Sequence, residues 1–135
     1  MTRTVHGGPA VKFGDPEYGQ DGMIVCPRCG SVNLHHRTVH VYTRPMEDAD
    51  GIHVETGCYS IDGGAAWKSG KSVIGVSAAP EAAFLGRRDD IRIEFWCESC
   101  SQSEDDTFLL LVVQHKGVTF IEWSADATPG AVRHA

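Results

Sequence analysis

Two short cysteine pairs constrain this chain more than any other feature of its sequence. Cys26 and Cys29 enclose two residues in "CPRCG", Cys97 and Cys100 do the same in "FWCESCSQ", and residues 30–96 separate the pairs. A turn of this kind can direct two sulfur atoms at one ion, and four thiolates at about 2.3 Å complete a tetrahedral zinc shell. We therefore predict one structural zinc ion held by Cys26, Cys29, Cys97 and Cys100.

The fifth cysteine and the cellular compartment bear on this prediction. The N-terminal "MTRTVHGGPAVKFG" has no apolar core of signal-peptide length, and no apolar run approaches the roughly 20 residues that cross a bilayer, so we expect a cytoplasmic protein without membrane contact. A reducing compartment disfavours disulfides and favours metal ligation. Cys58 is expected to lie outside the shell as a small thiol, because a nucleophile needs a positioned His and Asn or Asp, and only His53 lies nearby.

Alternating apolar residues predict a mainly β fold. Residues 32–44 and 91–96 alternate with a period of two, as in half-buried strands. Residues 107–114 are apolar on both faces, which is typical of a central strand. Residues 115–117, "HKG", form a compact turn that returns the chain as a partner strand over 118–123. The pattern predicts an antiparallel sheet with the metal site at its end.

The same pattern predicts one domain over residues 23–123, with a long loop-rich insertion at about 45–90. Within the insertion, "MEDADGIHVETG" is expected to form a turn and a short strand, "KSVIGVSA" a strand, and "APEAAFLG" one helical turn. Residues 1–22 lack periodicity and are interpreted as a flexible arm, in which "VKFG" could dock at a sheet edge. Residues 124–135 are interpreted as a tail.

One glycine-rich stretch, "GGAAWKSGKS", invites interpretation as a phosphate-binding loop. That motif needs glycine five residues before Gly70, where the chain has Ala65, and Gly64 comes one residue too early. It also needs a helix afterwards, whereas the β-like "VIGV" follows. We interpret the stretch as a loop that carries Trp67 and two lysines, without a phosphate site.

The histidines His36 and His40 invite a second interpretation, as a metal pair. Four residues apart on a strand, they lie about 13 Å from each other at about 3.3 Å per residue, so they cannot share an ion. We expect a polar, pH-sensitive sheet surface instead.

The charge balance leaves nucleic-acid binding as an alternative function. A net charge of −6 opposes generic affinity for nucleic acid or anionic membrane. A local basic and aromatic set could still contact nucleic acid. That set comprises Arg28, Arg37, Arg44, Lys68, Lys71, Arg87, Arg88 and Lys116 beside Tyr42, Trp67 and Trp96.

The chain resembles a zinc ribbon in "CPRCG", in "CESC" and in the hairpin that follows. In wider layout it is similar to small zinc-ribbon proteins of unknown function from actinobacteria and their phages, through "CPRCGSVNLHH", "RRDDIRIEFWCESC" and "QHKGVTFIEW". The resemblance implies a fold and an origin, extends residue by residue to the four cysteines only, and implies no activity. The second knuckle departs from the pattern, with Ser101 where glycine is usual.

Three functions follow as hypotheses. Zinc can replace the large core that a small, loop-rich chain cannot build, which favours a binding or adaptor module for a protein partner, a host factor if the gene is phage-borne or part of a mobile element. Nucleic-acid binding is the alternative. "CPRCG" also resembles a rubredoxin knuckle, which would make the chain an iron electron carrier, although "CESCS" lacks the matching proline and glycine. A closed four-thiolate shell leaves no position for substrate, so we expect no enzymatic activity.

Overall fold

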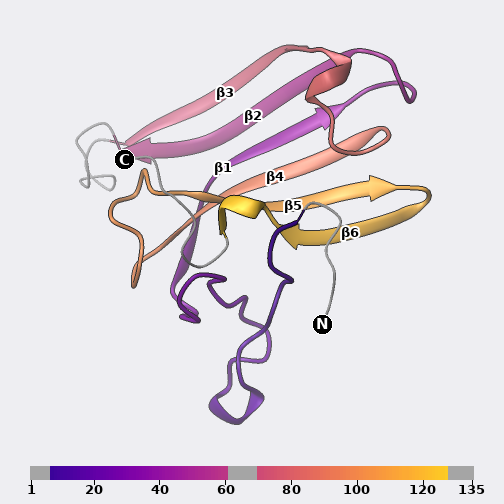
Figure 1. The fold of residues 1–135 in the computed structure, drawn as a ribbon. Helices are drawn as coiled ribbons and strands as arrows, with labels where there is room; N and C mark the ends of the chain where they lie inside the picture. Colours follow the sequence, from indigo (N-terminus) through magenta and orange to yellow (C-terminus); the bar gives the residue numbers. More distant parts are fainter. Residues whose placement is uncertain (1–6, 61–69, 128–135) are drawn as a thin grey trace. The chain divides into compact units, whose positions relative to one another are not determined.

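Six antiparallel strands form one sheet in this computed structural model, which describes residues 7–60 and 70–127. The strand order across the sheet is β3-β2-β1-β4-β5-β6 (Figure 1). The strands span Leu34–Thr43 (β1), Gly51–Ser60 (β2), Gly70–Ala79 (β3), Asp89–Cys97 (β4), Phe108–His115 (β5) and Val118–Trp123 (β6). The expected mainly β, antiparallel class is confirmed.

The chain divides into two compact units, which are described separately below. The first unit contains the described parts of Met1–His36, Glu94–Leu110 and Ile121–Ala135. The second contains Arg37–Ile93 and Leu111–Phe120, again within the described ranges. The four predicted metal ligands all belong to the first unit.

Two aromatic side chains form the centre of the first unit. Phe108 and Trp123 are fully buried, and their rings meet edge to face with centroids 5.3 Å apart. Phe95 also meets Trp123 edge to face, at 5.4 Å. Such pairs add about 0.5–1.5 kcal/mol to the stabilisation from burial. The aromatic cluster therefore stabilises the unit that contains the four cysteines.

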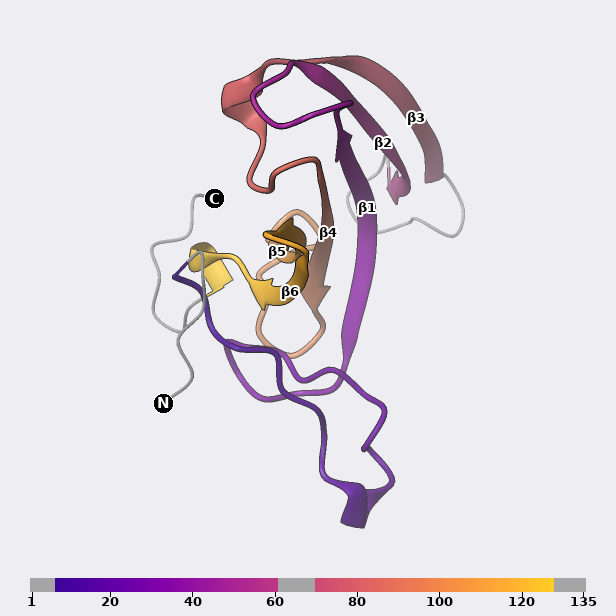
Figure 2. The ribbon, with the colours of Figure 1, turned by 90° about the vertical axis from the view of Figure 1, so that its right-hand side faces the viewer.

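The long insertion contributes two full strands to the second unit. β2 pairs with β3 along its whole length, from Gly51 opposite Ala79 to Ser60 opposite Gly70, and Figures 1 and 2 show the two strands running side by side. The strand expected in "MEDADGIHVETG" is therefore ten residues long, longer than the short strand that the sequence suggested. The expected helical turn is the 3-10 turn Glu81–Ala83.

Gly57 lies inside β2, where the strand approaches β1 closely. Glycine usually weakens a strand interior, unless another backbone approaches closely. A Cβ atom at Gly57 would lie 2.6 Å from the carbonyl oxygen of Arg37 in β1, so only glycine lets the strands approach here. Glycine at this position is thus a requirement of the pairing.

The hairpin between β5 and β6 has the compact turn that "HKG" predicts. Its two loop residues, Lys116 and Gly117, have φ angles of 51° and 75°. Positive φ at both positions is the signature of a type I′ turn, whose twist matches that of the flanking strands.

The N-terminal segment makes two β-bridges within the first unit. Ala10 bridges Glu122 in the edge strand β6, and Phe13 bridges Ile24. Between these positions and the first cysteine pair lies the 3-10 turn Pro16–Tyr18. Ala10 precedes "VKFG", and Phe13 pairs with Ile24 outside the named strands, so edge docking of "VKFG" and the flexibility of residues 1–22 stay predictions.

The expected C-terminal tail begins with a 3-10 turn, Ala125–Ala127, whose last residue is buried. Residues 128–135 lie outside the described part of the chain. Within the described ranges, no helix has the length and apolar character needed to cross a membrane.

Candidate metal centre

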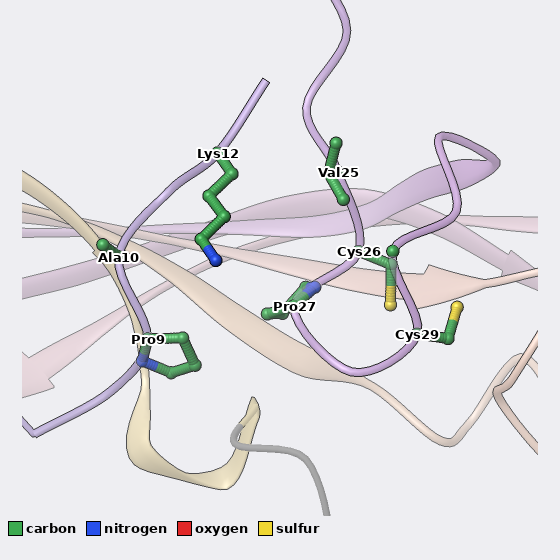
Figure 3. Close-up of a pocket in the computed structure, with 8 residues that line it drawn as sticks. Pro9, Ala10, Lys12, Val25, Cys26, Pro27 and Cys29 are labelled. Carbon is green, nitrogen blue, oxygen red and sulfur yellow. The ribbon is translucent and has the colours of Figure 1, made fainter. Parts of the chain in front are cut away.

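The first knuckle is a tight turn closed by its own backbone. The Gly30 N–H donates to the Cys26 carbonyl at 2.9 Å, and the Cys26 N–H donates to the Ser31 carbonyl at 2.7 Å. Gly30 has φ of 84°, the left-handed conformation that glycine adopts at no steric cost. The turn thereby directs the sulfur atoms of Cys26 and Cys29 toward each other (Figure 3).

The second knuckle begins at the last residue of β4. The Ser101 N–H donates to the Cys97 carbonyl at 3.0 Å, which closes the turn. The Ser101 hydroxyl accepts from the Cys97 N–H at 2.9 Å and donates to the Asp106 carbonyl at 3.0 Å. Serine in place of the usual glycine therefore has a structural role here, because its hydroxyl connects the knuckle to the loop that follows.

The four cysteines that the sequence selects lie together. Their sulfur atoms are all within 4.8 Å of one another, with 3.7 Å from Cys26 to Cys100 and 3.6 Å from Cys29 to Cys97. These distances exceed the S–S bond of about 2.05 Å. They approach the edge of about 3.8 Å that a sulfur tetrahedron has when each metal–sulfur bond is about 2.3 Å. The cluster is compatible with one tetrahedral metal ion.

Arg28, inside the first knuckle, links it to the loop after the second. Its guanidinium pairs with Asp106 at 3.1 Å and donates to the Asp126 carbonyl at 3.1 Å. The same guanidinium lies 4.6 Å from the centroid of the Phe108 ring. The side chains of Arg28 and Asp106 are only 3% and 12% exposed. This pair holds the two knuckles together through contacts of the protein itself.

The pKa values of the clustered thiols shift in opposite directions. Burial and the nearby Cys26 sulfur raise the pKa of Cys100, and burial likewise raises the pKa of Cys26. Burial also acts to raise the pKa of Cys97, but the N–H groups of Ser99 and Cys100 outweigh it, so that pKa is lowered. A cation bound among the sulfurs would favour the thiolate form of its ligands.

A pocket of about 330 Å³ lies on the other flank of the first knuckle. Figure 3 shows Lys12 reaching into it toward Pro27, on the side away from the two sulfur atoms. Pro9, Ala10, Lys12, Val25, Cys26, Pro27, Cys29 and Gly30 line it. The pocket leaves this flank of the knuckle accessible without adding a ligand to the cluster.

The basic set that suggested nucleic-acid binding is partly engaged inside the protein. Arg28 and Arg44 are buried, and both donate to protein oxygens. Arg87 lies 3.5 Å from the carboxylate of Glu47. Arg28 and Arg44 are therefore structural residues in this fold.

The end of the glycine-rich stretch and Cys58, which the sequence also singled out, both lie in the β2–β3 pair. Gly70–Ala79 form β3, so a strand follows the glycine-rich stretch where a phosphate loop needs a helix. Residues 61–69, with Trp67, lie outside the described part of the chain. Cys58 belongs to β2 and pairs with Ser72 through the backbone.

Sequence reasoning missed a second cluster, in which His40 lies beside His53. The Nδ1 atom of His40 is 2.8 Å from Nε2 of His53, and 3.5 Å from a carboxylate oxygen of Glu55. Burial, followed by the proximity of His40, lowers the pKa of His53. Only the pairing of β1 with β2 brings these residues together, so the spacing of histidines along the chain carries no signal for it.

Replacing Asp106 with asparagine should destabilise the protein by about 2 kcal/mol, because hydrogen bonds to charged groups contribute about 1.5–3 kcal/mol and Arg28 would lose its counter-ion. The same change should lower metal affinity, since the knuckles would be held together less firmly. Urea unfolding and competition with a chelator would measure the two effects. Asp105→Asn, at the exposed neighbouring position, is the matched control, and equal effects of both variants would contradict the role given to the Arg28–Asp106 pair.

Comparison with family models, with curated proteins and with solved structures finds no match to this chain.

Proposed function

We propose that this chain is a zinc-ribbon-like protein whose cysteine cluster holds one structural zinc ion, and that it acts as a binding module for a protein partner. The observation that carries the proposal is the close clustering of four cysteine sulfurs, contributed by two knuckles, at separations compatible with one tetrahedral ion. A four-thiolate set is typical of structural zinc sites. Because such a shell is closed, the proposal assigns no catalysis to this ion.

Zinc is preferred to iron because of the second knuckle. Iron carriers with four thiolates use two similar proline- and glycine-containing knuckles, whereas the second knuckle here is closed by the Ser101 hydroxyl. The two metals also differ in a simple readout, since an iron tetrathiolate absorbs visible light and a zinc tetrathiolate does not. We infer one zinc ion in the cysteine cluster of a cytoplasmic protein.

An exposed apolar surface in the second unit supports the partner-binding part of the proposal. Ile74 and Val76, on the edge strand β3, are 85% and 68% exposed, and Ile52 on β2 is 42% exposed. These three residues share one face, because Val76 is opposite Val54 and Ile52 is opposite Ala78. Exposed apolar patches of this kind mark interaction sites.

The position of β3 indicates how a partner would bind. It is the outermost strand in the order of the sheet, so one side of its backbone has no strand partner among the described residues, and an added strand would pair there. The proposed occupant is therefore an extended, apolar segment of another protein that pairs with β3 and covers Ile74 and Val76. The zinc-ribbon resemblance suggests an actinobacterial or phage origin. If the gene is phage-borne, the proposed partner is a host factor.

Site-specific crosslinking in the native host tests the partner. A photo-crosslinking residue at position 76 should give one discrete protein adduct, because it lies on the proposed face. The same residue at position 121, which is exposed on β6 and remote from β3 in the strand order, should give none. Ile74→Lys should abolish the adduct formed from position 76.

Three outcomes would contradict this partner. Equal adducts from positions 76 and 121 would show that the surface is not selective. Adducts that nuclease removes would favour nucleic-acid binding, and adducts only between copies of this chain would indicate self-association.

A further inference from the structure

His40, His53 and Glu55 converge on one face of the β1–β2 pair, away from the cysteine cluster in the sequence and in a different unit. In the antiparallel register, His40 is directly opposite Glu55, and His53 is opposite Tyr42. His40 and His53 are thus diagonal neighbours, a relation within reach of aromatic side chains. Each residue offers one ligand atom, and the three atoms lie within 4.8 Å of one another.

The surroundings hold the rings in position. Tyr42 stacks on His53 with centroids 4.4 Å apart and an angle of 8° between the rings. Phe84 and the Arg92 guanidinium in turn pack on Tyr42, the guanidinium at 3.9 Å from the ring centroid. Arg92 is fixed by the buried carboxylate of Asp90 at 2.8 Å. A supported histidine loses little freedom when it binds a ligand, which favours binding.

The three donor atoms have nearly the spacing of a metal shell. Tetrahedral zinc with bonds of about 2.0–2.1 Å to nitrogen and oxygen places its ligand atoms about 3.3 Å apart. The observed separations are 2.8 Å from His40 to His53 and 3.5 Å from His40 to Glu55. An adjustment of a few tenths of an ångström would therefore accommodate an ion.

We propose that His40, His53 and Glu55 bind a divalent transition-metal ion, in the first instance Zn²⁺, as a second metal site of this protein. Two histidines and one glutamate are a known three-ligand set for zinc, and three protein ligands leave a fourth position open to water or to a donor from outside the chain. This site differs in kind from the cysteine cluster, whose four sulfurs close the shell.

The alternative is that the three side chains only share a proton. A separation of 2.8 Å between ring nitrogens is an ordinary hydrogen-bond length, in which one ring donates and the other accepts. In that case the three side chains would not form a zinc-binding site. The two interpretations differ in metal stoichiometry, and the difference does not depend on what the cysteine cluster binds or on which protein partner is used.

Calorimetric titration of the purified, metal-loaded full-length protein with Zn²⁺ tests the second site. One further ion per chain should bind. Glu55→Gln, which preserves shape and removes the charge, should weaken this binding at least about tenfold, the scale on which even supporting residues of metal sites act. His53→Asn should abolish it.

His36→Asn is the matched control, because it removes a histidine from the same strand and leaves the cluster intact. It should bind the second ion like the wild type. Zinc-dependent NMR shifts should fall on the ring nitrogens of His40 and His53, and this readout needs no variant to fold. Absence of a second binding event, or equal weakening by His36→Asn and Glu55→Gln, would overturn the proposal.

Discussion

Replacing Cys97 with serine should abolish zinc retention and unfold or aggregate the protein. The Cys97 side chain is fully buried, and its sulfur lies in the cluster at 3.6 Å from that of Cys29. A metal site absent from the unfolded chain converts its binding energy into folding energy, on the order of 10 kcal/mol or more in zinc-finger peptides. That is comparable with the whole stability of a typical domain, about 5–15 kcal/mol. Elemental analysis and circular dichroism would measure both effects.

Two controls separate the loss of a ligand from other damage. Ser99→Ala changes an exposed residue of the same knuckle without removing a sulfur. Cys58→Ser removes a thiol outside the two pairs. Both variants should retain one zinc per chain and fold normally, as should the wild type, whose solution should be colourless. A well-folded, metal-free Cys97→Ser protein would show that the cluster is not a structural metal site, and visible absorption by the wild type would replace zinc with iron.

Replacing Arg44 with methionine should destabilise the protein by on the order of 3–5 kcal/mol. Its guanidinium donates to the carbonyls of Arg87 at 2.7 Å, Gly86 at 2.9 Å and Ala49 at 3.2 Å, and it lies 4.4 Å from the centroid of the Phe84 ring. Hydrogen bonds from a charged donor contribute about 1.5–3 kcal/mol each, and the carbonyls left behind would lose their partner in a buried place. Urea unfolding would measure the change.

Arg88→Met is the matched control for Arg44, because Arg88 is an arginine of the same unit with an exposed side chain. Its effect should stay within about 0.5 kcal/mol, as for most surface substitutions. The destabilisation caused by Arg44→Lys should lie between those of Arg44→Met and Arg88→Met. The lysine ammonium keeps the charge, but it lacks the planar guanidinium that reaches three carbonyls at once. Equal stability of Arg44→Met and Arg88→Met would mean that the three carbonyls are satisfied in another way.

The local features of this fold could be predicted from the sequence, because their causes are local. The spacing of Cys26 and Cys29, with Gly30 after them, sets the geometry of a knuckle within five residues. Alternation with a period of two marked the strands that became β1 and β4, and continuous apolar residues marked β5. The β5–β6 turn followed from a single glycine at position 117. In each case the physical cause lies within one turn or one strand.

The length of β2 and the positions of the arginines depended on tertiary structure. The sequence suggested only a short strand here, whereas β2 is ten residues long and approaches β1 closely at Gly57. Arg28 and Arg44 read as solvent-exposed charges, yet each is buried against oxygens from segments distant in sequence. Burial of a charge depends on which partners the fold brings to it, and the sequence alone does not specify those partners.

The two clusters of ligand residues show the same division most clearly. The sequence by itself determined that four cysteines in two short pairs would converge, because each pair is pre-arranged and one ion can join both. The sequence by itself did not determine that His40 lies beside His53, because that contact depends on the register of β1 against β2. A shift of one residue in this register would turn one of the two histidines to the other face. Register is set by the pairing of whole strands, so only the tertiary structure decided that this face carries three metal-binding side chains.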